Sequence, residues 1–307
     1  MNKMLVSVII PNRNGEKTIE KTIASAEKSL EGNRLEIIVV DDCSEDHSTV
    51  ILKKISESNR RISFFENRKK VGAAFSRNIG ILNAAGDVLL FIDNDVFLKE
   101  DCGAVLAKRA FSNNGISFPR IIFPNGRLMW PASSTEEKYP EISACFAIKK
   151  SALKKVEKFD SNYETYLEDS DFFLRCMALR IKASYEKNAV ALHAISGFYS
   201  AERRYFLENR NLVYGMLKFR RIKPEKRGPF TFSSLVKNLA CGIFNFRWFD
   251  WSHYKRNGSW KIKLKMLFGK HKKITEKPFL VLLVIFFYAV IMGLVGAVFK
   301  SSSKRNI

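Results

Sequence analysis

The chain has 307 residues, enough for one large or two small globular domains with a substantial core. A hydrophobic content of 46% excludes a mainly disordered protein. Residues 201–307 carry 23 Lys and Arg against five Asp and Glu, so most of the net charge of +21 lies in the last third. This asymmetry argues against a chain wrapped in nucleic acid and favours a basic tail on a nearly neutral domain.

Cysteine usage and the amino terminus indicate a cytosolic chain. The five cysteines are scattered and form no CxxC pair, so we expect reduced thiols. The amino terminus lacks a basic region followed by an apolar one, and we therefore expect no secretory signal.

The first 100 residues alternate between predicted strands and helices. Apolar runs at 5–10, which ends before Pro11, and at 35–40 predict buried strands, and a short strand follows at 62–65. Helices are predicted over 18–30, 48–58 and 72–85. This pattern is typical of a nucleotide-binding α/β domain, yet it contains neither a GxGxxG nor a GxxxxGK loop. A metal ion held by carboxylates is another way to bind a diphosphate.

An apolar strand predicted over 89–96 carries two carboxylates, Asp93 and Asp95, at its carboxyl end. Side chains two residues apart in a strand point to the same side, so both can bind one Mg²⁺ or Mn²⁺ ion. The alternative is a strand end that is simply closed by turn-forming residues.

The pattern is less regular after residue 100. We predict a helix over 101–111, a hairpin over 116–129, a strand over 142–148 and a helix over 150–156. Three carboxylates, Glu168, Asp169 and Asp171, begin a helix that ends near residue 179, where they could serve only to favour the helix N-terminus. A late strand over 189–192 leads to His193.

Six segments occur in an order that resembles one known family. They are 7–14 (SVIIPNRN), 40–46 (VDDCSED), 72–80 (GAAFSRNIG), 93–95 (DND), 168–171 (EDSD) and 210–211 (RN). Together they resemble glycosyltransferase family 2, the inverting nucleotide-sugar transferases of the GT-A fold. The resemblance implies an α/β, Rossmann-like catalytic domain with a mixed central sheet over residues 1–215.

The resemblance also implies roles for particular residues. The base and ribose of the donor would be bound by Pro11, Asn12, Arg13, Asp41 and Asp42, and its diphosphate region by Arg77, Asp93 and Arg210. Asp93, Asp95 and His193 would hold the divalent metal, and Asp169 would be the catalytic base with Glu168 beside it. Family members often have Tyr in place of Arg13 and Gly in place of Cys43.

Structural alternatives exist for several of these residues. His193 could be an ordinary residue at a strand end, and Arg77 and Arg210 could be solvated helix charges. Asp46 and Asp171 are interpreted as structural rather than ligand residues.

The chemistry of inverting transfer agrees with two separate carboxylate groups. One carboxylate, remote from the metal, takes the proton of the acceptor hydroxyl, while a cation neutralises the leaving diphosphate. Asp169 and the pair of Asp93 and Asp95 match these two requirements.

The carboxyl-terminal third predicts membrane attachment. Residues 278–299 are 22 residues without a charge, a helix about 33 Å long, which is enough to span a bilayer. The segment 216–277 is basic and aromatic, as in a segment lying on an anionic lipid surface, and a short tail, 300–307, follows the span. Because the basic residues are concentrated on the amino-terminal side of the predicted span, we expect a single-pass protein in the cell membrane with a cytosolic catalytic domain. We expect no nucleic-acid partner.

The sequence thus predicts a membrane-anchored, metal-dependent glycosyltransferase that moves a hexose or deoxyhexose to a glycan or a lipid-linked acceptor. Two other enzymes are alternatives: a polyprenyl-phosphate sugar synthase, and a nucleotidyltransferase, which would release pyrophosphate. A non-catalytic nucleotide-binding scaffold at the membrane is the alternative of another class.

Overall fold

The computed structural model describes residues 4–130, 143–194, 201–220 and 229–235, together with positions 287, 290, 291 and 294. The chain divides into two compact units, Met1–Phe198 and Tyr199–Ile307. The predicted domain boundary at residue 215 falls within helix α7 (Ala201–Lys218) of the second unit.

The first unit is built on a mixed sheet whose strand order is β3-β2-β1-β4-β8-β6-β9-β5. Its parallel part consists of β1 (Leu5–Asn12), β2 (Arg34–Asp41), β3 (Ile62–Glu66) and β4 (Val88–Ile92). All five residues of β4 are buried, as expected of a strand covered on both faces. The carboxyl ends of β1, β2 and β4 consequently meet at one edge of the sheet.

The second part of the sheet is mainly antiparallel. It contains β5 (Val96–Leu98), β6 (Ile116–Ile122), β7 (Leu128–Trp130), β8 (Cys145–Lys149) and β9 (Ala183–His193). Strand β8 runs antiparallel to both β4 and β6, whereas β9 runs parallel to β6. The carboxyl ends of β6 and β9 therefore lie at the same edge as that of β4.

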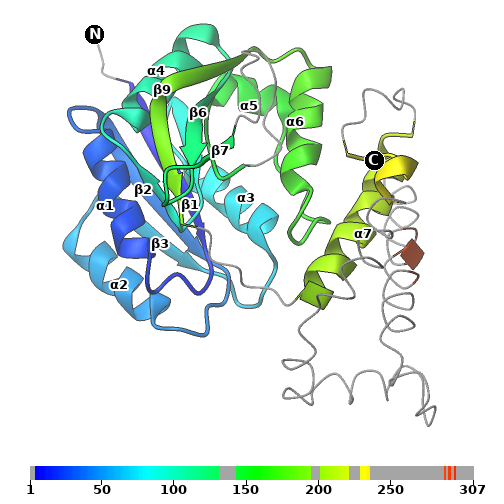
Figure 1. The fold of residues 1–307 in the computed structure, drawn as a ribbon. Helices are drawn as coiled ribbons and strands as arrows, with labels where there is room; N and C mark the ends of the chain where they lie inside the picture. The colour runs from blue at the N-terminus through cyan, green and yellow to red at the C-terminus, as the bar shows by residue number, and fades with distance from the viewer. Residues whose placement is uncertain are drawn as a thin grey trace. The chain divides into compact units, whose positions relative to one another are not determined.

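Helices cover both faces of the sheet (Figure 1). Apolar residues of α1 (Ile19–Ser29), α2 (Ser48–Ser58) and α4 (Cys102–Asn113) form one core with the sheet. The opposite core contains residues of α3 (Ala73–Asn83), α5 (Lys150–Val156) and α6 (Glu168–Ala178). The sheet is thus the middle of three layers, and the predicted α/β class with a mixed sheet is confirmed.

Three strand predictions need correction. The predicted strand 89–96 is two strands, because a turn at residues 93–95 separates β4 from β5. The strand predicted at 189–192 begins at Ala183, where its polar residues pair with β6 and so gave no apolar signal. Strand β1 continues through Pro11, which is tolerated because β4 pairs with β1 only as far as Ile9.

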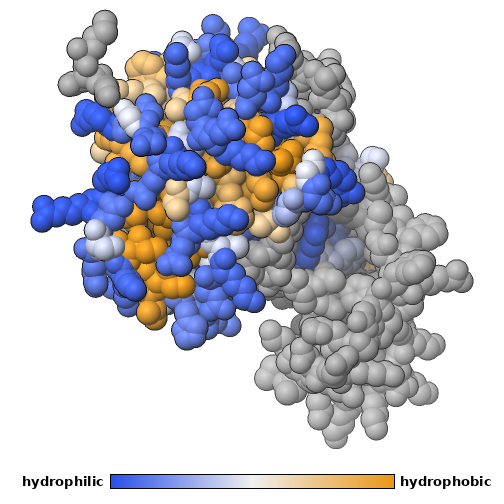
Figure 2. Space-filling model, turned by 60° about the vertical axis from the view of Figure 1, so that its left-hand side comes forward, coloured by the Kyte–Doolittle hydropathy of each residue, from blue (hydrophilic) through white to orange (hydrophobic). Residues whose placement is uncertain are grey.

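Hydrophobic surface is visible in patches between hydrophilic side chains on one face (Figure 2). Large apolar side chains are exposed on α2 (Val50), α3 (Leu82) and α6 (Met177). Apolar surface of this kind is common on folded proteins and by itself assigns no partner.

The second unit contains α7, whose Gly215 makes room for Phe230. A Cβ atom at Gly215 would lie 2.0 Å from the Phe230 ring, which also packs against Phe219 with ring centroids 5.3 Å apart. Phe230 is fully buried, although the sequence places it in the predicted interfacial segment. Among the described residues no helix combines the length and the apolar character of a membrane span, and the predicted span 278–299 lies outside them except at four positions.

Candidate active site

The turn between β4 and β5 places the two carboxylates of the DND segment at the carboxyl edge of the sheet. The Asp93 amide donates to the Ala144 carbonyl at 3.0 Å, and the Val96 amide donates to the Asp93 carbonyl at 3.1 Å. Between the two carboxylates, the Asn94 side chain donates to the Asn12 Oδ1 atom at 2.8 Å. The turn is therefore fixed to the end of β1 and to the residue that precedes β8.

Asp93, Asp95 and His193 form a candidate metal centre. One ligand atom from each lies within 4.8 Å of the other two. The His193 Nε2 atom is 3.1 Å from the Asp95 Oδ1 atom, because β5 pairs antiparallel with β9 and brings the end of β9 beside the turn. Two carboxylates and one imidazole suit Mn²⁺ or Mg²⁺, so the predicted residues fit a divalent cation.

The charge of this cluster raises the pKa of His193. Burial on its own would lower that pKa, but the hydrogen bond and charge of Asp95, and the charge of Asp93, outweigh burial. The Nδ1 atom of His193 is buried and has no hydrogen-bond partner among the described residues. The cluster thus attracts positive charge, whether a proton on the imidazole or a metal cation.

Arg77 of α3 connects the candidate metal centre to the start of α6. Its guanidinium is 2.7 Å from Asp93 Oδ1 and 3.0 Å from Glu168 Oε1. Only 3% of the Arg77 side chain is exposed, so the interpretation as a solvated helix charge is wrong. Burial lowers the pKa of Arg77, yet the charges of Asp93 and Glu168 prevail and raise it, which keeps the guanidinium charged.

Asp169 lies next to Glu168 at the beginning of α6. Its carboxylate accepts hydrogen bonds from the Ser170 amide at 2.7 Å and from the Ser143 amide at 3.2 Å. Burial, followed by the charge of Glu168, raises the pKa of Asp169 to about 7, although those amides and Arg77 act in the opposite direction. A carboxyl group with such a pKa can accept a proton near neutral pH.

Glu168 is itself buried, and burial raises its pKa even though Arg77 opposes the change. Asp171, further into α6, is fully buried and pairs with Arg175 at 2.8 Å. This geometry agrees with the structural interpretation of Asp171.

The acidic residues after β2 hold the backbone of the predicted nucleotide site. Asp41 accepts from the Asn12 side chain at 2.6 Å and from the Ser44 amide at 2.8 Å. Asp42 accepts from the amides of Val71 at 2.8 Å and Gly72 at 2.9 Å, which anchors the beginning of α3. These contacts join the ends of β1 and β2 to α3, while the predicted contacts of Asp41 and Asp42 with a nucleotide stay predictions.

Arg13 and Cys43 are the two positions at which this chain departs from the family pattern. Arg13, which follows Pro11 and Asn12 at the end of β1, donates to the carbonyls of Asp42 at 2.6 Å and Cys43 at 2.7 Å. Cys43 has a φ of 60°, in the left-handed region that glycine adopts most readily. The guanidinium of Arg13 therefore stabilises a loop whose backbone favours Gly at the position of Cys43.

One predicted residue lies outside the first unit, and one residue of the site was not predicted. Arg210 lies on α7 in the second unit, where it donates to Asn211 Oδ1 at 2.7 Å, and its role at the diphosphate stays a prediction. Sequence reasoning overlooked Asn94 as the residue that fixes the turn. A polar residue between the two carboxylates was the only signal, because its partner Asn12 is 82 positions away.

A mixed α/β sheet with an acidic cluster, a buried arginine and further carboxylates at its carboxyl edge is typical of enzymes that bind their ligands at the ends of the strands. The family model for glycosyl transferase family 2 matches residues 7–186, more than half of the chain. The chain therefore belongs to glycosyl transferase family 2, and the family prediction is confirmed.

Sequence relatives agree with this family. Over 211 residues the chain is 26% identical to poly(ribitol-phosphate) beta-N-acetylglucosaminyltransferase TarS of Staphylococcus aureus, covering 66% of this chain and 36% of the relative. Over 95 residues it is 37% identical to the Escherichia coli protein UDP-Glc:alpha-D-GlcNAc-diphosphoundecaprenol beta-1,3-glucosyltransferase WfgD, covering 31% of this chain and 36% of the relative. The chain thus spans little more than a third of the length of these relatives.

Solved structures share the fold. S. aureus TarS 1-349 in complex with UDP-GlcNAc has a TM-score of 0.54 at 19% identity, covering 94% of this chain and 82% of that one. Mannosyltransferase PcManGT from Pyrobaculum calidifontis, in complex with GDP-Man and Mn²⁺, has a TM-score of 0.57 at 14% identity, covering 95% and 88%.

Proposed function

We propose that this protein transfers a sugar from a nucleotide-diphosphate sugar to a hydroxyl group, with inversion and with a divalent metal ion. One observation carries the proposal: Arg77 joins the candidate metal ligand Asp93 to Glu168, the neighbour of Asp169. A candidate metal ligand and the neighbour of the proposed base are thereby held by a single buried side chain. The structures of PcManGT with GDP-Man and Mn²⁺ and of TarS with UDP-GlcNAc support such a donor and metal.

Each group of the site has a role in this reaction. Asp169 takes the proton from the acceptor hydroxyl, which makes its oxygen a better nucleophile. Mn²⁺ or Mg²⁺, held by Asp93, Asp95 and His193, would neutralise charge on the diphosphate. Arg77 holds Asp93 and Glu168 in fixed positions and balances two of the negative charges around the base.

We further propose that the acceptor is a glycan or a lipid-linked molecule and that the protein is anchored in the membrane. The uncharged run at 278–299 and the basic, aromatic segment 216–277 support this location. The names of TarS and WfgD, which act on a poly(ribitol-phosphate) and on a diphosphoundecaprenol-linked sugar, are compatible with it. A catalytic domain on the basic side would be cytosolic.

A donor screen with the purified full chain tests the proposal. Release of nucleoside diphosphate is measured from UDP-, GDP- and dTDP-sugars, with Mn²⁺, with Mg²⁺ and with a chelator. We expect release from one donor class, its loss with the chelator, and a decrease of at least about 10²-fold in Asp169→Asn. Glu57→Gln, which changes an exposed carboxylate on α2, is the control. Release of pyrophosphate instead, or full activity of Asp169→Asn, would refute the proposed reaction.

A further inference from the structure

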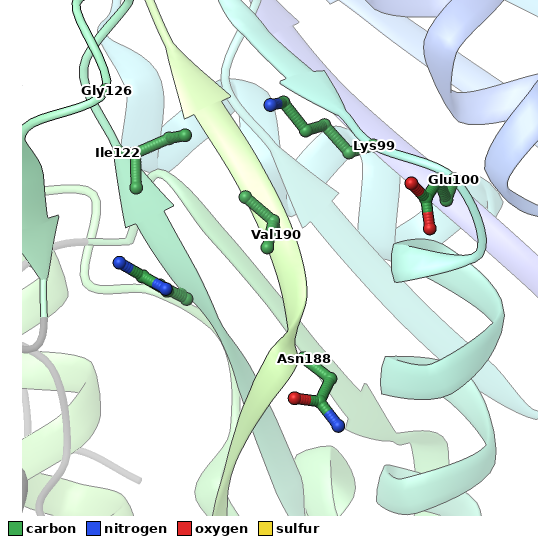
Figure 3. A pocket seen from close by; sticks show the side chains of 7 residues that line it. Lys99, Glu100, Ile122, Gly126, Asn188 and Val190 are labelled. Atoms are coloured by element: carbon green, nitrogen blue, oxygen red, sulfur yellow. The ribbon is translucent and has the colours of Figure 1, made fainter.

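A cavity lies in the first unit, at strands β6 and β9. Its volume is about 360 Å³, and it is lined by side chains and backbone of Lys99, Glu100, Arg120, Ile122, Gly126, Asn188 and Val190. These residues come from β6, from β9, and from the segments that follow β5 and β6 (Figure 3). None of them has a role in the reaction described above.

An irregularity in β9 shapes this cavity. Pro119 of β6 pairs with Glu186, but the next residue, Arg120, pairs with Val190. Three residues of β9, 187–189, are therefore extra at this point, and Asn188 among them is exposed. Bulges of this kind redirect side chains and are frequent near functional sites.

The cavity lies on the same face of the sheet as Asp169. Phe118 of β6 packs against Phe173 of α6, with ring centroids 5.5 Å apart, whereas Ile121 belongs to the core on the α4 face. Arg120 is two residues after Phe118, so alternation along the strand places it on the α6 face. Asp169 lies at the start of that same helix.

The cavity and the candidate metal centre both include residues of β9. Val190 precedes His193 by three residues of β9, a separation of about 10 Å at the rise of a strand. The Lys99 amide donates to the Val190 carbonyl at 2.9 Å. Lys99 follows the last residue of β5, and Asp95 precedes its first. Ala189 and Ala191 of β9 belong to the core on the α4 face, so alternation places the His193 side chain on that face and Val190 on the α6 face. The face shared with Asp169 is therefore what connects the cavity to the candidate site.

The charges of the lining indicate what the cavity binds. The Lys99 and Arg120 side chains are exposed, and within the described part of the chain neither makes an ion pair or a side-chain hydrogen bond. Glu100 is the single carboxylate among the lining residues, so the lining has a net positive charge. Two cations without an anionic partner, together with the Asn188 amide, are suited to a phosphate or carboxylate group.

We propose that this cavity binds an anionic group, a phosphate or a carboxylate, that belongs to the sugar acceptor. The inference rests on the proposed transferase function and adds the chemical class of its acceptor: a chain or carrier that has a negative charge. Lys99 and Arg120 contact the anion, and Glu100 weakens its binding by repulsion.

Binding to the full chain is measured first, with glycerol 3-phosphate, inorganic phosphate and uncharged glycerol as probes. We expect ³¹P NMR titration to show binding of both phosphates, and Lys99→Ala/Arg120→Ala to weaken it about fivefold. The matched control, Lys28→Ala/Arg60→Ala, removes one exposed Lys and one exposed Arg that do not line the cavity. This control should bind the phosphates with wild-type affinity. Glu100→Gln should bind more tightly. Equal affinity of wild type and the cavity variant would overturn the proposal.

Kinetics then connect the cavity to the acceptor. With a phosphate-bearing acceptor and its dephosphorylated form, the cavity variant should raise KM only for the charged acceptor, about fivefold, and leave kcat unchanged. Inorganic phosphate should compete with that acceptor in wild type. An unchanged KM, despite loss of phosphate binding, would assign the cavity to a free anion and overturn the acceptor proposal. Release of nucleoside diphosphate in the donor screen reports on the transferase function separately, so failure of that screen would count against that function and leave the binding result valid.

Discussion

The raised pKa of Asp169 allows a quantitative prediction of the pH dependence of transfer. Burial and the adjacent Glu168 charge place this pKa at about 7. Because a general base must be deprotonated, kcat/KM should be constant above pH 7 and fall about tenfold per pH unit well below it. Activity is lost at acid pH, because a protonated Asp169 carboxyl group cannot take the proton of the acceptor hydroxyl.

Glu168→Gln perturbs this pKa in a known direction. The substitution removes a negative charge next to Asp169, so the pKa of Asp169 should fall and the acid limb should move to lower pH. Arg77, which lowers the pKa of Asp169, remains and acts in the same direction. The limb in Glu57→Gln, an exposed α2 variant, should stay at the wild-type position.

The assay follows nucleoside diphosphate release in buffers of constant ionic strength from about pH 5 to about pH 9. This range extends about two pH units to either side of the Asp169 pKa of about 7. Circular dichroism at each pH confirms that the variants stay folded. A limb that moves to higher pH in Glu168→Gln would refute the electrostatic explanation. Persistence of the limb in Asp169→Asn would show that another group is the base.

Three further substitutions test the metal centre, the buried arginine and the loop before α3. Asp95→Asn should weaken Mn²⁺ binding at least about tenfold by isothermal titration calorimetry, and unchanged affinity would exclude Asp95 as a ligand. Arg77→Lys should lower the free energy of unfolding by about 2–3 kcal/mol in urea titration, because lysine cannot pair with both the half-buried Asp93 and the buried Glu168. Arg61→Lys, at a pair that is 60% exposed on the arginine side, should change it by less than about 0.5 kcal/mol. Gly72→Ala should cost about 3 kcal/mol, since its Cβ atom would lie 1.7 Å from the Glu164 carbonyl oxygen at a φ of 92°. Gly32→Ala, with a φ of 78° and no atom within 4 Å, should cost about 1 kcal/mol, and equal losses would mean that the contact is irrelevant.

The sequence by itself determined the class of fold and the carboxylates of the site. Buried strands are continuous apolar runs, as at 35–40, and turn residues follow them directly, so the order of strands and helices is visible in local pattern. For the same reason Asp93 and Asp95 could be selected as candidates before the structure, since they follow a recognisable strand, whereas Asp169 was selected through the family resemblance.

Tertiary structure decided how these residues meet. The DND segment is a turn rather than a strand end, because the Asp93 amide bonds to Ala144, just before β8, and Asn94 bonds to Asn12 of β1, and neither partner is local. Arg77 is a buried bridge because α3 and α6, about 90 positions apart, pack on one face of the sheet. The extra residues of β9 and the cavity they open depend on pairing with β6. Local sequence sets which backbone states are favourable, whereas contacts between distant segments set which side chains share a site.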